Sequence, residues 1–127
     1  VNAYDNALLY TDHFLATTID LLAARSDYDT ALVYVSDHGE SLGEKGLFLH
    51  GMPYAIAPAE QVHVPMVMWF SPGFLRDARL DAGCLRQVAT RPASHDNLFS
   101  SMLGLMQVHT TTYDASLDLF ARCRSTI

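Results

Sequence analysis

The sequence predicts an α/β domain built in layers, with a mostly parallel sheet. An amphipathic helix pattern is followed by two short runs that are apolar on both faces, as strands buried inside such a sheet are. A long glycine-rich loop separates the two runs, and a second amphipathic pattern follows them. Because two strands are too few for a complete sheet, we expect further strands to pair from outside this chain, or copies of the chain to associate and cover the edges.

The first half of the chain supplies one helix, one strand and the loop. From Tyr4 to Leu22, apolar side chains recur at three- and four-residue spacing, which predicts an amphipathic helix. The run from Thr30 to Val35 is rich in β-branched residues and predicts a buried strand. Residues 37–62 are rich in glycine and proline, so we expect a long loop with a short helical turn. Loops of this length inside compact domains are usually functional.

The second half contains a strand, a connector and a helix. Val64 to Phe70 predicts another strand, with Pro65 near its start, where a missing N–H is tolerated. Residues 74–93 are mixed in character and predict a connector with one helical turn. Ser94 is placed to cap a helix whose apolar positions continue to Met106, and the tail from Thr110 is expected to be irregular.

Composition excludes several classes of function. The net charge is −6 and the arginines form no stripe, so nucleic acid is not an expected partner. No apolar run reaches the roughly 18 residues needed to span a bilayer, and no signal-peptide pattern is present, so we expect this chain to be soluble. The chain lacks an initiator methionine and begins within the helix pattern, so we expect that sequence upstream of Val1 is missing.

The chain has two cysteines, Cys84 and Cys123. They permit one disulfide in an oxidising compartment, and two unpaired thiols are equally compatible with the count.

The first strand ends in two adjacent side chains that can bind a metal, Asp37 and His38. Ligands of open α/β sheets bind outside the carboxyl ends of strands, which is where this pair stands. A carboxylate and an imidazole are normal zinc ligands, and Gly39 permits the sharp turn that lets neighbours share an ion. The alternative is a plain turn, in which Asp37 bonds backbone amides and His38 is exposed.

Other polar residues of the loop carry weaker signals. His50 is followed by glycine, as His38 is, and the glycine-rich loop between them can fold His50 back over the same site, although it can also be an ordinary surface histidine. Glu40 and Glu44 can add charge near a metal but are not predicted as ligands. No serine lies in a Gly-x-Ser-x-Gly elbow, so a hydrolase triad is not supported.

The stretch from Tyr34 to Tyr54, followed by Ala57-Pro58 and Val64 to Trp69, closely resembles the phosphoethanolamine transferases of Gram-negative bacteria. These enzymes belong to the alkaline phosphatase and sulfatase superfamily and decorate lipid A or other envelope glycans. The resemblance runs nearly end to end. It also includes four flanking segments, namely Asn2 to Asn6, Tyr10 to Asp12, His95 to Phe99 and Leu103 to Leu105.

The resemblance implies that residues 1–127 are the C-terminal part of an alkaline-phosphatase-like, three-layer catalytic domain. Asp37 and His38 would then complete a zinc (Zn²⁺) site, and His50 would bind the transferred phosphoryl group or a second zinc. The nucleophilic threonine and the remaining ligands would lie upstream of Val1, as would membrane helices that anchor the parent protein in the inner membrane with this domain in the periplasm. That compartment favours disulfides, with Cys123 or an upstream cysteine as the partner of Cys84.

The resemblance further implies a reaction. Phosphoethanolamine would pass from phosphatidylethanolamine to threonine and then to lipid A or another glycan, and this chain alone would be inactive. Two alternatives remain within the superfamily, a sulfatase and a glycerol-phosphate transferase of the lipoteichoic acid synthase type. A third is a non-catalytic module that kept the fold.

Overall fold

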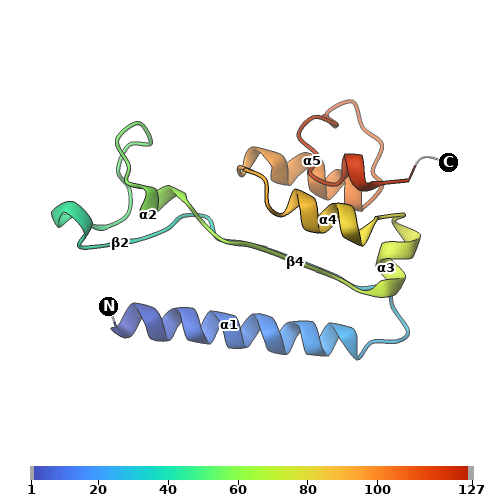
Figure 1. Cartoon of the computed structure of the whole chain (residues 1–127), viewed down its shortest axis with the longest axis horizontal. Helices are drawn as coiled ribbons and strands as arrows, with labels where there is room; N and C mark the ends of the chain where they lie inside the picture. Colours follow the sequence, from blue (N-terminus) through green and yellow to red (C-terminus); the bar gives the residue numbers. More distant parts are fainter. Residues whose placement is uncertain (1, 126–127) are drawn as a thin grey trace. The chain divides into compact units, whose positions relative to one another are not determined.

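The computed structural model describes residues 2–125 as two compact units, one ending at Ser71 and the other beginning at Pro72 (Figure 1). The elements of the first unit are α1 (Asn2–Ala23), β1 (Ala31–Val35), β2 (Ser41–Leu42), η1 (Glu44–Gly46), β3 (Phe48–Leu49), α2 (Ala59–Val62) and β4 (Met66–Phe70). Those of the second are α3 (Pro72–Asp77), α4 (Ala82–Val88), α5 (Asp96–Leu105) and η2 (Ala121–Cys123).

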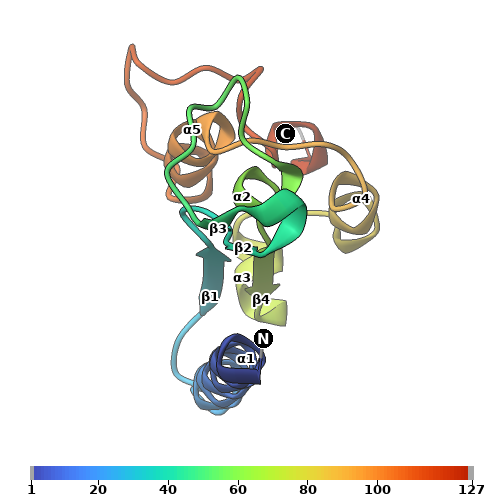
Figure 2. The same ribbon diagram turned by 90° about the vertical axis from the view of Figure 1, so that its left-hand side faces the viewer.

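The predicted N-terminal helix is confirmed as α1, which runs alongside the β1–β4 pair (Figures 1 and 2). None of its residues is buried, and its apolar positions Leu8, Phe14 and Leu21 are more than half exposed. Within residues 2–125, no helix combines the length and the hydropathy that crossing a membrane requires.

Both predicted strands are confirmed, but they pair antiparallel, from Ala31 opposite Phe70 to Val35 opposite Met66. The predicted α/β fold class is therefore confirmed. The prediction of parallel pairing is not met by β1 and β4, the two longest strands among the described residues. The reason is that the connector leaves β1 and returns to β4 at the same end, as in a hairpin, while a parallel neighbour would need a crossover to the opposite end. An antiparallel edge strand on an otherwise parallel sheet is common in α/β folds.

The connector is more ordered than the predicted loop. It contains a two-stranded ladder of β2 and β3, and the expected helical turn is present twice, as η1 and α2. The buried side chain of Gln61, in α2, ties the segments together. Its Nε2 donates to Ser41 Oγ at 2.9 Å, and its Oε1 accepts from the Met52 N–H at 3.3 Å.

Most buried apolar side chains of residues 2–125 lie in the second unit, among them Leu80, Leu105 and Phe120. Two short helices, α3 and α4, occupy the stretch predicted to be a connector with one turn, so that prediction was wrong in extent. Asp81 was an available signal, because its carboxylate caps α4 by accepting from the Cys84 N–H. The preceding strand ends at Phe70, and Pro72 lies in the first turn of α3.

Helix α5 begins at Asp96, close to the predicted cap. Ser94 Oγ accepts from the Asp96 N–H at 3.3 Å, while the Ser94 N–H donates to Asn97 Oδ1 at 2.9 Å. Two buried serines of α5 then hold the irregular tail. Ser100 Oγ accepts from the Asp114 N–H at 3.2 Å, and Ser101 Oγ accepts from the Leu119 N–H at 2.9 Å.

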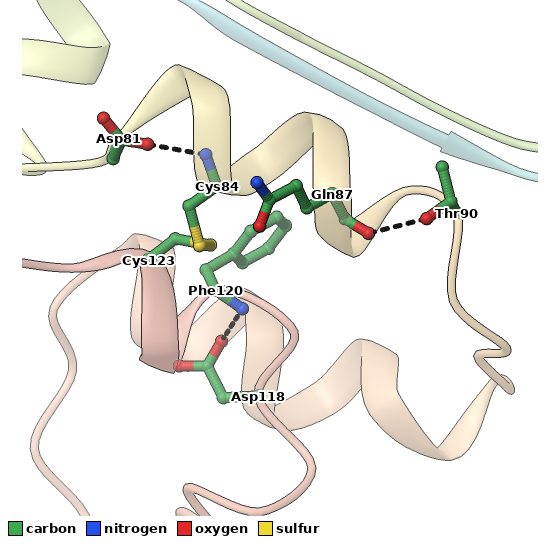
Figure 3. The surroundings of a disulfide bond; sticks show 7 residues. All are labelled: Asp81, Cys84, Gln87, Thr90, Asp118, Phe120 and Cys123. Atoms are coloured by element: carbon green, nitrogen blue, oxygen red, sulfur yellow. Dashed lines mark hydrogen bonds between the residues drawn. A yellow bond between two sulfur atoms is a disulfide. The ribbon is translucent and has the colours of Figure 1, made fainter.

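A disulfide joins Cys84 of α4 to Cys123 of η2, which settles the pairing that the sequence left open (Figure 3). Phe120, with 0% of its surface exposed, lies beside the bond. The neighbouring Asp118 carboxylate accepts hydrogen bonds from Arg124 at 2.7 Å and from the Tyr113 hydroxyl at 2.8 Å. Burial of the Tyr113 hydroxyl raises its pKa, and the hydrogen bond to the negatively charged Asp118 carboxylate raises it further.

Replacing both cysteines by alanine is expected to destabilise the second unit by about 2 to 4 kcal/mol, because the bond closes a loop with a sequence separation of 39 residues. Urea unfolding of the chain measures this loss. Reduced wild-type chain is the control and should unfold at the same urea concentration as the double variant. An unchanged midpoint would show that the disulfide contributes nothing to stability.

Candidate metal centre

The first unit places Asp37 and His38 one residue beyond the end of β1, where the connector leaves the strand pair. The turn is closed locally, since Ser36 Oγ donates to the His38 carbonyl at 2.9 Å and the His38 N–H donates to Asp37 Oδ1 at 3.1 Å. The Asp37 side chain is 90% exposed. The backbone therefore forms the turn that the sequence analysis gave as the alternative to a metal site. This turn uses Asp37 Oδ1 and leaves Asp37 Oδ2 free for a ligand.

Gly39 is needed for a different reason from the one the sequence suggested. Its φ is not in the left-handed region, and its N–H donates to the Gln61 carbonyl at 2.9 Å. A Cβ at this position would overlap the carbonyl oxygen of Glu60. Glycine therefore serves the close approach of two backbone segments, which fixes the residues on either side of it against α2.

The imidazole of His38 is held in one tautomer. Its Nδ1 lies 2.9 Å from the Gly39 carbonyl oxygen, which can only accept, so in the neutral ring Nδ1 carries the proton and Nε2 the lone pair. His38 Nε2 is 3.9 Å from Asp37 Oδ2. This separation is slightly longer than the roughly 3.4 Å between two ligand atoms of a tetrahedral zinc ion.

The connector returns His50 to His38. The two ring centroids are 3.9 Å apart, with an angle of 30° between the planes. The loop thus folds as the glycine-rich sequence suggested, and the role of His50 stays a prediction. Leu49, the residue before it, has a φ of +66°, which is unusual for leucine and typical of backbone constrained at a functional site.

A third side chain completes a cluster that the sequence did not single out. His38, Glu40 and His50 each offer one ligand atom, and these atoms all lie within 4.8 Å of one another. Glu40 Oε1 is buried and has no hydrogen-bond partner among the described residues. The imidazole of His38 and the carboxylate of Asp37 are donors of the types that a divalent cation such as zinc takes, and His50 and Glu40 lie beside them.

The remaining candidates lie outside this cluster. The Glu44 carboxylate accepts from the Leu42 N–H at 2.7 Å, and hydrogen bonds from the backbone N–H groups of Glu44 itself and Leu42 lower its pKa. This carboxylate therefore stabilises the turn, and its absence from the ligand set stays a prediction. Among the described residues, the other four histidines belong to no such cluster. One signal for Glu40 was available, because alternate residues of an extended segment share a face, as His38 and Glu40 do.

Comparison with known proteins gives a consistent result. The family model described as Sulfatase matches residues 1–108. Phosphoethanolamine transferase EptA from Salmonella typhimurium is 49% identical over 126 residues, which make up 98% of this chain and 23% of that protein. Phosphatidylethanolamine transferase Mcr-2 from Escherichia coli is 61% identical over 70 residues, or 54% of this chain and 13% of that protein.

A solved structure is also closely similar. It is the integral membrane protein lipooligosaccharide phosphoethanolamine transferase A from Neisseria meningitidis. The TM-score is 0.94 at 49% identity, over 99% of this chain and 24% of that one. The chain thus spans a quarter or less of the length of these relatives.

Replacing Gly39 by alanine is expected to push α2 away from the Asp37–His38 turn and to cost about 1 to 3 kcal/mol, because the new methyl group has no room. Hydrogen exchange of peptides covering residues 36–65 measures the opening, which should be faster in the variant. Gly46→Ala is the control, since that position has a φ of +76° but open space around it, and its effect should be confined to the η1 turn. Unchanged exchange in the Gly39 variant would contradict the close approach.

Proposed function

Because the chain belongs to the sulfatase family, we propose that it is the metal-binding part of a phosphoethanolamine transferase. Its donor would be phosphatidylethanolamine, and its acceptor lipid A or another envelope glycan. One observation carries the proposal. Asp37 and His38 lie just beyond β1 with His50 stacked on His38, in a chain 49% identical over almost its whole length to a protein named for that activity.

Zinc is the proposed cofactor, and the residues fit it. Asp37 Oδ2 and His38 Nε2 would hold the ion, since both atoms are free of other hydrogen bonds and the Gly39 carbonyl keeps the His38 lone pair on Nε2. When bound, zinc would supply positive charge that activates a hydroxyl nucleophile and offsets negative charge on phosphoryl oxygens.

The residues of this chain would have two separate roles. Asp37 and His38 fix the position of the positive charge at the end of β1. His50, whose ring stacks on His38, would contact the transferred phosphoryl group through Nε2. The part of the loop that carries His50 is tied to α2 through Gln61, so that the phosphoryl contact and the metal ligands are set by one small framework.

The nucleophile is proposed to be a threonine elsewhere in the complete protein. Its oxygen would attack the phosphorus of phosphatidylethanolamine, forming a phosphoethanolamine–threonine ester and expelling diacylglycerol, which takes up a proton. An acceptor hydroxyl or phosphate oxygen would then attack the same phosphorus and regenerate threonine. Either step needs groups from outside this chain, so we expect the chain alone to be inactive.

We propose that the parent protein is anchored in the bacterial inner membrane with this part in the periplasm. The Neisseria relative is an integral membrane protein. The Cys84–Cys123 disulfide also supports an oxidising compartment.

Two features separate the proposal from its alternatives. A sulfatase would carry a cysteine or serine nucleophile that is converted to formylglycine, whereas a transferase would carry the threonine. A non-catalytic module of the same fold would have no need of Asp37 and His38 with His50 stacked beside them, and all three side chains are present here.

Asp37→Ala and His38→Ala, each made in the complete protein, are expected to lower zinc-dependent transfer by about 100-fold or more, because each removes a ligand. The assay follows labelled phosphoethanolamine from phosphatidylethanolamine in membranes. Asp12→Ala and His13→Ala are matched controls, because the same dipeptide occurs on the exposed surface of α1.

The outcomes separate the claims. Loss of transfer in the Asp37 and His38 variants but not in the Asp12 and His13 controls would support both the activity and the ligand roles. Cleavage of sulfate or glycerol-phosphate esters in place of transfer would overturn the substrate assignment. Equal activity in all four variants would contradict the proposed metal site.

A further inference from the structure

Glu40 is the member of the cluster to which the proposed function assigns no role. Its Oε2 lies 3.2 Å from His50 Nδ1. The Glu40 side chain is 22% exposed, against 90% for Asp37, so it is not a freely solvated loop carboxylate. Removing a carboxylate from water is costly unless it is paired, and the imidazole of His50 is the partner that the structure provides.

The contact constrains which nitrogen of His50 is open. A carboxylate only accepts hydrogen bonds, so Nδ1 must donate, and Nε2 is the nitrogen left for a substrate or a cation. His38 is fixed in the same way by the Gly39 carbonyl. Both stacked rings therefore expose Nε2, and in both the acceptor that holds Nδ1 comes from residues 39 and 40.

Glu40 Oε1 adds a second observation. This oxygen is buried with no hydrogen-bond partner among residues 2–125, a costly arrangement for a carboxylate whose role is only structural. Leu49 is held at a φ of +66° immediately before His50. The unpaired oxygen and the left-handed backbone therefore lie on the two sides of the hydrogen bond between Glu40 and His50.

We propose that Glu40 is a positioning residue, which holds His50 with Nδ1 protonated and Nε2 directed at the phosphoryl group. This rests on the proposed function, because it assigns His50 a phosphoryl contact. The role differs from that of Asp37, since Glu40 acts through a histidine and is not a ligand of the ion that Asp37 and His38 would hold.

The test compares Glu40→Ala and Glu40→Gln in the complete protein, with Glu60→Gln as the matched control on the exposed face of α2. Nitrogen-15 NMR at mildly alkaline pH reports the tautomer of His50. In the alanine variant, His50 should lose the Nδ1–H form. The glutamine variant should keep much of it, because the amide oxygen can still accept. Glu60→Gln should match wild type.

Kinetics and metal content complete the test. The alanine variant should lose about 10- to 100-fold in kcat with a smaller change in KM, while bound zinc stays at the wild-type level. The glutamine variant should recover part of this loss. An unchanged His50 tautomer in the alanine variant would overturn the proposal, and so would zinc lost from the glutamine variant, because that would make Glu40 a ligand.

Different results would contradict the two proposals. If the wild-type protein transfers no phosphoethanolamine, the proposed function is wrong. The tautomer of His50 in the two Glu40 variants would still decide whether Glu40 positions the ring.

Discussion

The close approach of Gly39 to Glu60 and Gln61 is the contact on which the site depends. It brings the turn after β1 within one hydrogen bond of α2, and it leaves no room for a side chain at position 39. The same helix supplies Gln61, which reaches Ser41 and Met52 on both arms of the loop. Because these bonds close the connector on itself, His50 returns to His38 even though the two are twelve positions apart.

The first unit achieves this with few buried apolar side chains. Its loop is organised by hydrogen bonds to buried polar groups, notably Ser41 and Gln61, while α1 leaves its apolar residues exposed. The second unit is organised differently, around Phe120, the Cys84–Cys123 bond and the buried Asp118 carboxylate. A polar framework suits a site that must hold charged groups, because its dipoles are already oriented when a ligand arrives.

The spacing of apolar residues predicted α1, both long strands and α5, because each of these elements has a regular apolar pattern within its own short stretch of sequence. Strand direction was not predictable in this way, since it depends on where the connector returns and not on the composition of β4. The helices α3 and α4 were missed because they are only six and seven residues long and are held by packing and the disulfide. Asp37, His38 and His50 were recognisable as candidates, whereas the contact of Glu40 with His50 exists only once the loop is closed.

Anomalous diffraction at the zinc absorption edge, from crystals of the complete protein, would locate a bound zinc ion and identify its ligand atoms. We predict one zinc ion bound by an Asp37 carboxylate oxygen and His38 Nε2, with Glu40 still hydrogen-bonded to His50 Nδ1. An ion bound elsewhere, or His38 bound through Nδ1 with its Gly39 contact broken, would contradict the account.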